Sequence, residues 1–177
     1  MRGKFDLLIK LFKLPKYYRI VPKMYLFVNF IYQRIFRLNS DVPFSVHFTN
    51  KIQGYSGMQL GDSVKFSLAV SGGCYITAFP GTKLIIGEGT ILAPNVAIQT
   101  GNHGLLDRGL YDIADINIGK NCWLGFGVVI LAGVSLGNNV TVGANSVVTK
   151  SFSGNVVIAG VPAKIIKEIT CVELQDN

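Results

Sequence analysis

Two histidines, His47 and His103, are the side chains in this sequence best suited to take up a proton at neutral pH. An imidazole has a pKa of about 6.5, which allows it to act as a general base. His103 directly precedes a charged stretch, residues 104–117, which we expect to be a loop. Loops on rigid scaffolds often carry functional sites. We therefore predict that His103 is the better placed of the two to act as a base, and that His47, in the segment VPFSVHFTN, is structural.

A metal site is not expected from the sequence. The three cysteines, Cys74, Cys122 and Cys171, are far apart and show no CxxC or CxH spacing. Such spacing predicts neither a zinc site nor a disulfide framework. Two histidines also cannot supply the three imidazoles of a three-histidine zinc site. Unpaired cysteines of this kind are typical of a reducing cytoplasm.

The elements that must position His103 follow from an internal repeat. Residues 118–153 divide into six units of six residues: IGKNCW, LGFGVV, ILAGVS, LGNNVT, VGANSV and VTKSFS. The first position of each unit is aliphatic, the second is Gly in four of the six, and the fifth is mostly small or β-branched. The first positions are Ile118, Leu124, Ile130, Leu136, Val142 and Val148, and the fifth are Cys122, Val128, Val134, Val140, Ser146 and Phe152.

A sustained period of six is typical of neither a helix nor an amphipathic strand, and it indicates a parallel β-helix. A glycine-rich β-sandwich is the alternative, but such folds do not hold a six-residue period over this length. The block Ile86–His103 repeats the pattern, and a fainter repeat from Leu60 loses its phase between Phe66 and Thr82. We predict a solenoid over residues 41–153 with the loop 104–117 inserted, followed by a tail over residues 154–177.

Residues 1–40 carry no such repeat and form a basic N-terminal segment. Residues 1–38 hold nine Lys/Arg against one Asp, a balance of +8, whereas the remainder holds eight against nine, a balance of −1. Apolar residues interleaved with lysines, and prolines at 15 and 22, predict two short amphipathic helices. Two roles are open for these helices. They cap the open end of the solenoid and do nothing more, or they cap it and also contact an anionic membrane or a lipid-linked substrate.

Other roles for this basic segment are not expected. No nucleic-acid-binding motif accompanies the charge. The longest charge-free apolar stretch in the N-terminal third, Met24–Gln33, is shorter than the roughly 20 residues that span a bilayer. Lys10, Lys13 and Lys16 interrupt the apolar run that an export signal requires. The sequence therefore predicts a cytoplasmic protein, placed in the cytoplasm or at the cytoplasmic face of the membrane.

The repeats resemble those of the hexapeptide-repeat acyltransferases, in particular the sugar and polysaccharide O-acetyltransferases of the galactoside and maltose acetyltransferase type. The resemblance covers roughly residues 60–169 and is carried by IIGEGTILAPNVAIQTGNH and by the block that ends in AGVPAK. It implies an all-β solenoid, a left-handed parallel β-helix with about three hexapeptides per coil. It also implies a homotrimer that binds acetyl-coenzyme A in clefts between neighbouring subunits.

The resemblance also implies roles for individual residues. His103 matches the catalytic histidine, and the backbone N–H of Phe126, just after Trp123 and Gly125, matches the donor to the oxyanion. Gly143 and Ala144 match the path of the pantetheine chain. The positions that contact adenine and phosphates are matched by Thr149, Lys150, Lys164 and Lys167.

Several of these positions depart from the family pattern or leave alternatives open. The family often has Pro where Gly104 follows the histidine, Ser at Phe126, and Arg at Lys164 and Lys167. Trp123 either walls the acceptor or pantetheine site or packs in a turn. The acceptor that orients His103 is one of three aspartates or a backbone carbonyl; the aspartates are Asp107, Asp112 and Asp115.

The predicted function is transfer of acetyl from acetyl-coenzyme A to a hydroxyl of a sugar, in surface-polysaccharide or lipopolysaccharide biosynthesis. Two alternatives remain: an acetyltransferase acting on an amino sugar or on serine, and a non-catalytic β-helix scaffold. No serine or cysteine with a partnered base is indicated, so direct transfer is favoured over an acyl-enzyme.

Overall fold

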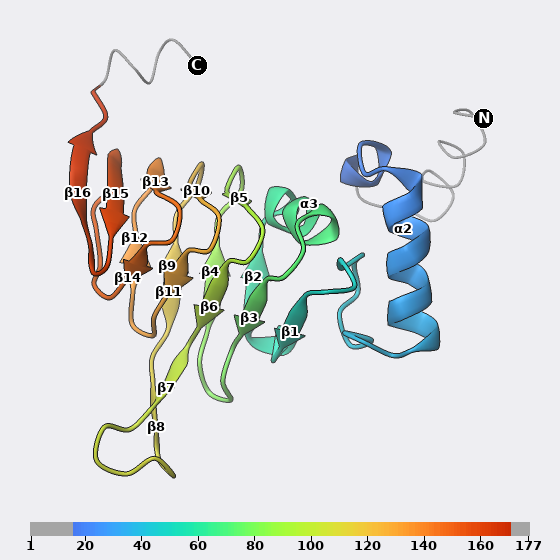
Figure 1. The fold of residues 1–177 in the computed structure, drawn as a ribbon, viewed down its shortest axis with the longest axis horizontal. Helices are drawn as coiled ribbons and strands as arrows, with labels where there is room; N and C mark the ends of the chain where they lie inside the picture. Colours follow the sequence, from blue (N-terminus) through green and yellow to red (C-terminus); the bar gives the residue numbers. More distant parts are fainter. Residues whose placement is uncertain (1–15, 171–177) are drawn as a thin grey trace.

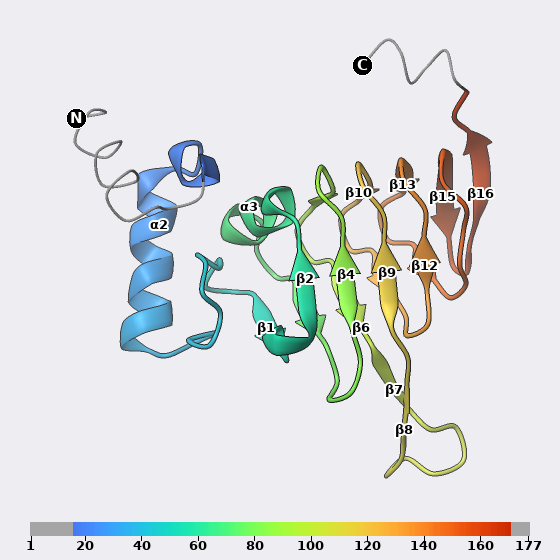
Figure 2. The same ribbon diagram turned by 180° about the vertical axis from the view of Figure 1, so that it is seen from behind.

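The fold is a left-handed parallel β-helix with a helical N-terminal segment, described by a computed structural model over residues 16–170 (Figures 1 and 2). The predictions made for residues 1–15, and those for Cys171 and the end of the tail, concern residues outside the described ones. The helical elements are η1 (Lys16–Arg19), α2 (Lys23–Phe30), η2 (Ile31–Ile35), η3 (Tyr55–Gly57) and α3 (Asp62–Val70). The break at Pro22 between η1 and α2 agrees with the sequence prediction.

Three sheets run along the solenoid, and all their strand pairs are parallel except β15–β16. Sheet A comprises β1 (Lys51–Gln53), β3 (Tyr75–Thr77), β6 (Ala97–Gln99), β11 (Val129–Ile130) and β14 (Val147–Val148). Sheet B comprises β2 (Met58–Leu60), β4 (Leu84–Ile86), β9 (Ile116–Ile118) and β12 (Ser135–Leu136). Sheet C comprises β5 (Ile91–Leu92), β10 (Trp123–Leu124), β13 (Val140–Val142), β15 (Val156–Gly160) and β16 (Ala163–Glu168).

The strand register explains the six-residue period. Leu124 pairs with Val142, Ile130 with Val148 and Ile118 with Leu136, each pair 18 residues apart, so one coil holds three hexapeptides. These first-position side chains are buried in columns inside the coil, and the fifth-position residues Cys122 to Ser146 are buried at its corners. The prediction of an aliphatic core built from these two positions is confirmed.

Glycine at the second position of the repeat is required because successive coils meet closely at the corner between sheets B and C. A Cβ added to Gly119 would lie 2.5 Å from the carbonyl oxygen of Gly137, and one added to Gly87 would lie 2.8 Å from that of Gly119. Real Cβ atoms do not approach backbone atoms this closely, so a side chain would push the coils apart.

The faint early repeat loses its phase because a helix takes the place of a strand. After β2 the chain forms α3, which lies over the first coil where sheet C would otherwise begin. The carboxylate of Glu88 accepts the backbone N–H of Asp62 at 2.6 Å and of Ser63 at 3.3 Å, so it satisfies free donors at the start of this helix. The expected run of strands over residues 41–153 is therefore interrupted.

The two boundaries of the solenoid also differ in detail from the sequence-based ones. The excursion is a hairpin of β7 (Gly101–His103) and β8 (Tyr111–Ile113), and Ile116 already lies buried in sheet B. At the other end, β15 continues sheet C beyond residue 153 and turns back through β16. Both differences arise because backbone pairing, which the repeat letters do not report, decides where the chain leaves the coil.

Replacing Gly119 by Ala is expected to lower the free energy of unfolding by about 1–3 kcal/mol, because the new methyl group collides with backbone of the next coil. Chemical denaturation measures the change. Gly109→Ala in the hairpin loop is the matched control, since its Cβ would meet the end of the Asp107 side chain at 3.2 Å. Equal losses in the two variants would contradict the close-packing explanation.

Candidate functional site

His103 ends strand β7 on the hairpin that projects from the corner between sheets A and B (Figure 1). Its Nδ1 atom lies 2.8 Å from the carbonyl oxygen of Arg108. A carbonyl only accepts hydrogen bonds, so Nδ1 must carry the proton in this contact. The neutral ring therefore leaves Nε2 unprotonated, and an exposed imidazole with a free Nε2 lone pair can accept a proton from a bound hydroxyl.

The hairpin loop that supplies this carbonyl is held by its own hydrogen bonds. The Arg108 guanidinium donates to the carbonyl oxygen of Gly104 at 3.0 Å. The Asp107 carboxylate accepts the N–H of Gly109 at 2.8 Å, and the Asp115 carboxylate accepts the N–H of Lys83 at 2.8 Å. Of the acceptors left open by the sequence, the backbone carbonyl is the one that contacts His103, and Asp107 and Asp115 have structural partners.

A row of tilted aromatic rings that sequence reasoning missed supports the His103 ring. The ring of Tyr111, directly opposite on β8, lies 4.7 Å from that of His103, and Phe79 lies 5.2 Å from Tyr111 on its other side. Phe79 also lines a hollow of about 420 Å³ between residues 53–57 and 77–82. No local pattern points to this row of rings, because Phe79 lies one coil away from Tyr111.

A second group of predicted residues lies at the corner between sheets C and A. Gly125 and Phe126 follow β10, and Gly143 and Ala144 occupy the equivalent places one coil later. The carbonyl of Phe126 accepts the N–H of Asn145 at 2.7 Å, which fixes this peptide. Within residues 16–170 no hydrogen bond uses the N–H of Phe126, so this donor is available.

Successive coils also meet closely at this corner, which is built from small residues. A Cβ on Gly125 would lie 2.9 Å from the N atom of Ala144, and one on Gly143 would lie 3.0 Å from the Cβ of Ala159. Trp123 is 56% exposed and pairs in register with Thr141, so it lies on the outer surface of sheet C and is not packed inside a turn.

The predicted cationic residues separate into two places. In sheet C, Lys164 pairs with Ala159 and Lys167 pairs with Val157. Val157 in turn pairs with Thr141, and Thr141 with Trp123, so Lys167 lies in one cross-strand row with Trp123. Thr149 and Lys150 instead follow β14 at the corner between sheets A and B, where the Lys150 ammonium lies 5.6 Å from the centre of the Phe152 ring.

The structure therefore gathers the predicted site residues along two different edges of one chain. The hairpin of His103, with Thr149 and Lys150, lies at the end of sheet A that leads to sheet B. Phe126, Gly143 and Ala144 lie at the opposite end of the sheet A strands (Figure 1). A single copy of the chain does not bring His103 next to Phe126.

His47 lies beside Gly72, where α3 leads into sheet A, two coils before Phe126 on the same corner. Its Nδ1 lies 2.9 Å from the Thr49 hydroxyl, and its ring stacks on Phe48 at 4.7 Å and near Tyr25 at 5.7 Å. Burial lowers the pKa of His47 below its ordinary value of 6.5, because the charged form loses water. Among residues 16–170, no group of three His, Cys, Asp or Glu side chains is arranged to hold a metal ion.

Comparison with known proteins finds similarity to hexapeptide-repeat acetyltransferases over part of the chain. Residues 115–150 match the family described as Bacterial transferase hexapeptide (six repeats). The galactoside O-acetyltransferase of Escherichia coli K12 is 46% identical over 88 residues, which cover 48% of this chain and 43% of that protein. A protein of the same strain named for O-acetyl transfer in lipopolysaccharide biosynthesis is 41% identical over 99 residues, 49% of this chain and 50% of that one.

Solved structures show the same arrangement of coils. A galactoside acetyltransferase in complex with coenzyme A superposes with a TM-score of 0.53 at 29% identity, covering 74% of this chain and 60% of that one. The chain thus spans about half the length of the relatives that it matches in sequence.

The contact with the Arg108 carbonyl predicts the tautomer of His103. At a pH where the ring is neutral, long-range ¹H–¹⁵N correlation spectra are expected to show a protonated Nδ1 and an unprotonated Nε2. The His47 signals, assigned through a His47→Gln variant, serve as the internal comparison. A protonated Nε2 on His103 would contradict the proposed hydrogen bond.

Proposed function

Because this chain carries the hexapeptide repeat of the bacterial transferases, we propose that it transfers acetyl from acetyl-coenzyme A to a hydroxyl of a sugar. The observation that carries this proposal is His103, whose Nδ1 is held by the Arg108 carbonyl so that Nε2 is free to accept a proton. The enzyme would use an oriented base, donors for a developing oxyanion and a cleft for the donor substrate.

His103 takes the proton of the acceptor hydroxyl as its oxygen attacks the thioester carbonyl carbon. The carbon–sulfur bond then breaks, and the proton held on Nε2 goes to the leaving sulfur, giving the O-acetyl sugar and free coenzyme A. The positive imidazolium is stabilised by its hydrogen bond to the Arg108 carbonyl. The neighbouring Tyr111 ring, tilted against the imidazole, limits how far it can turn away.

The corner after β10 fits the thioester end of the donor. The free N–H of Phe126 is placed to donate to the oxyanion, and Phe does not remove this donor because it belongs to the main chain. The pantetheine chain runs past Gly125, Gly143 and Ala144, where no large side chain rises from the corner and Ala144 is exposed. Lys164 and Lys167 on β16, with Thr149 and Lys150, supply the polar and cationic groups that adenine and phosphates require.

A homotrimer completes the site. His103 and Phe126 lie at opposite ends of the sheet A strands, so each active site needs the hairpin of one subunit and the corner after β10 of its neighbour. The solenoid has three sheets and so a triangular cross-section. It can present these two edges to two different neighbours at once, as closed threefold symmetry requires. This separation supports the trimer that the family resemblance implies.

The acceptor is expected to bind beside the hairpin. The hollow lined by Phe79 lies next to Tyr111 and carries the polar side chains of Gln53 and Ser56 among its walls. Polar groups of this kind suit the hydroxyls of a sugar. Surface-polysaccharide or lipopolysaccharide biosynthesis in the cytoplasm remains our prediction, supported by the name of the relative from Escherichia coli.

The first experiment measures release of free thiol from acetyl-coenzyme A in the presence of sugars. Replacing His103 by Ala is expected to lower acceptor-dependent turnover by about 10²–10⁴-fold, because the general base is removed. His47→Gln is the matched control and is expected to retain turnover. Undiminished activity in the His103→Ala variant would refute the proposed base.

The acceptor panel must also contain amino sugars and serine. Acetylation of an amine or of serine, with no reaction on sugar hydroxyls, would replace the proposed acceptor by that alternative. Absence of coenzyme A binding would favour a non-catalytic scaffold.

A site shared between subunits predicts complementation between two inactive variants. His103→Ala removes the base, and Ala144→Trp blocks the exposed corner where Ala144 lies. In trimers reassembled from a mixture of the two, some sites combine an intact hairpin with an intact corner. We expect turnover to return only in the mixture, to about a quarter of the wild-type rate for random 1:1 assembly if neighbouring pairs act independently.

The complementation assay has its own control and its own failing outcome. Each variant is denatured and refolded alone before the same assay, so that recovery by refolding is excluded. Mixtures that stay inactive while each variant still forms trimers would contradict a shared site, without deciding whether His103 is the base.

A further inference from the structure

The helix of the N-terminal segment is inverted: it turns polar residues toward the protein and apolar residues outward. Asn29 is fully buried, and its amide donates to the Ser45 hydroxyl at 2.9 Å and to the Ala69 carbonyl at 3.0 Å. Gln33 donates to the Phe44 carbonyl at 3.0 Å and accepts the N–H of Val46 at 2.9 Å. These bonds dock α2 and η2 against the first coil and α3.

The outward face of the same segment is apolar. Met24 is 71% exposed, Phe27 is 61% exposed and Ile35 is 66% exposed. Residues spaced by three and four lie on one side of a helix, so these side chains form a stripe opposite the buried amides. Phe30 and Phe36 widen it and are also exposed. An apolar stripe of this size on the outside of a folded protein marks an interaction surface.

The charge around the stripe is of one sign. Residues 16–38 contain five Lys/Arg and no Asp or Glu, namely Lys16, Arg19, Lys23, Arg34 and Arg37. Over residues 1–38 the balance is nine Lys/Arg to one Asp. Apolar side chains surrounded by cations are characteristic of helices that lie in the interface of an anionic membrane.

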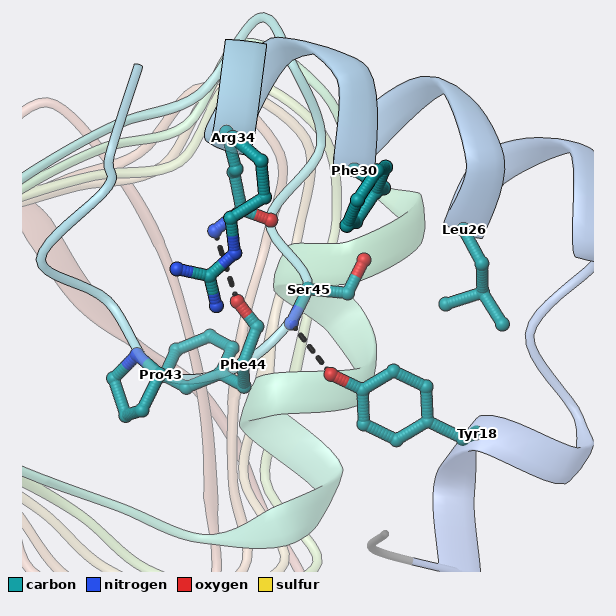
Figure 3. A pocket seen from close by; sticks show the side chains of 8 residues that line it. Tyr18, Leu26, Phe30, Arg34, Pro43, Phe44 and Ser45 are labelled. Carbon is teal, nitrogen blue, oxygen red and sulfur yellow. Dashed lines mark hydrogen bonds between the residues drawn. The ribbon is translucent and has the colours of Figure 1, made fainter. Parts of the chain in front are cut away.

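An apolar hollow opens beside the stripe (Figure 3). Its volume is about 240 Å³, and Leu26, Phe30 and Pro43 line it together with the Arg34 side chain. The Tyr18 hydroxyl in its wall accepts the N–H of Ser45 at 2.8 Å. The hollow therefore offers apolar surface next to one cation, which suits the junction between a lipid chain and its phosphate.

We propose that α2 and η2 form a docking surface for an anionic lipid bilayer, with Met24, Phe27 and Ile35 inserted below the headgroups and Arg34 and Arg37 at the phosphates. A twofold contact between two copies of this surface fits less well, because it would bring like charges together. Anionic headgroups neutralise the same charges. None of the described helices is long and apolar enough to cross a membrane, so the contact is with the surface.

Flotation of the full chain with vesicles of phosphatidylcholine, with and without phosphatidylglycerol, tests the proposal. Wild type is expected to float with the anionic vesicles, and the Met24→Ser/Phe27→Ser double variant to bind them at least tenfold more weakly. Arg34→Gln/Arg37→Gln is expected to weaken binding about fivefold for each charge removed, and high salt to reduce it further. Both pairs are exposed, so the fold is retained.

Matched controls distinguish binding through this surface from non-specific binding through other exposed apolar or cationic residues. Leu105→Ser/Leu106→Ser removes two fully or largely exposed leucines from the hairpin loop, and Lys83→Gln/Lys120→Gln removes two exposed cations from the solenoid. Both are expected to float like wild type. Equal loss in a control, or no flotation of wild type with anionic vesicles, would overturn the proposal. So would a drop in assembly mass by light scattering for Met24→Ser/Phe27→Ser, which would assign the stripe to a second copy. None of these readouts depends on acetyl transfer.

Discussion

Parallel stacking of identical coils is the constraint on which the rest of the molecule depends. Neighbouring strands in a sheet lie about 4.8 Å apart, so each residue must fit directly against its equivalent 18 residues away. This produces the aliphatic columns inside, and it forbids a Cβ at Gly87 and Gly119, where backbone meets backbone. The coil is therefore rigid, and a chain that leaves it must return in register.

The hairpin of His103 makes use of that rigidity. Its base is closed by the N–H of Ala114, which donates to the carbonyl of Thr100, and by buried Ile116, which resumes sheet B. Between these anchors the loop satisfies its own polar groups, so the Arg108 carbonyl remains fixed opposite Nδ1 of His103. A base on a flexible loop would lose this orientation, whereas here the scaffold and the hairpin define it together.

The parts of the fold that repeat could be predicted from the sequence, and the parts that occur once could not. The period gave the columns led by Ile118 and Leu124 because each position recurs in the same environment. Helix α3 breaks the period over only nine residues, and one of its buried positions, Ser67, is polar, so the apolar spacing typical of a helix is incomplete. The Arg108 carbonyl and the Phe79–Tyr111 contact depend on backbone path and on contacts between coils, which composition does not encode.

The N-terminal helix shows why an amphipathic pattern alone does not say which face is buried. Three backbone groups beside the helix have no partner in a strand or helix: the carbonyl of Phe44 and the N–H of Val46, which lie before β1, and the carbonyl of Ala69 in the last turn of α3. Leaving such groups buried and unpaired costs about 1–3 kcal/mol each. Side-chain amides can satisfy them, so Asn29 and Gln33 face the protein and the apolar stripe is left outside. Capping the solenoid and exposing an apolar surface are thus two results of the same hydrogen bonds.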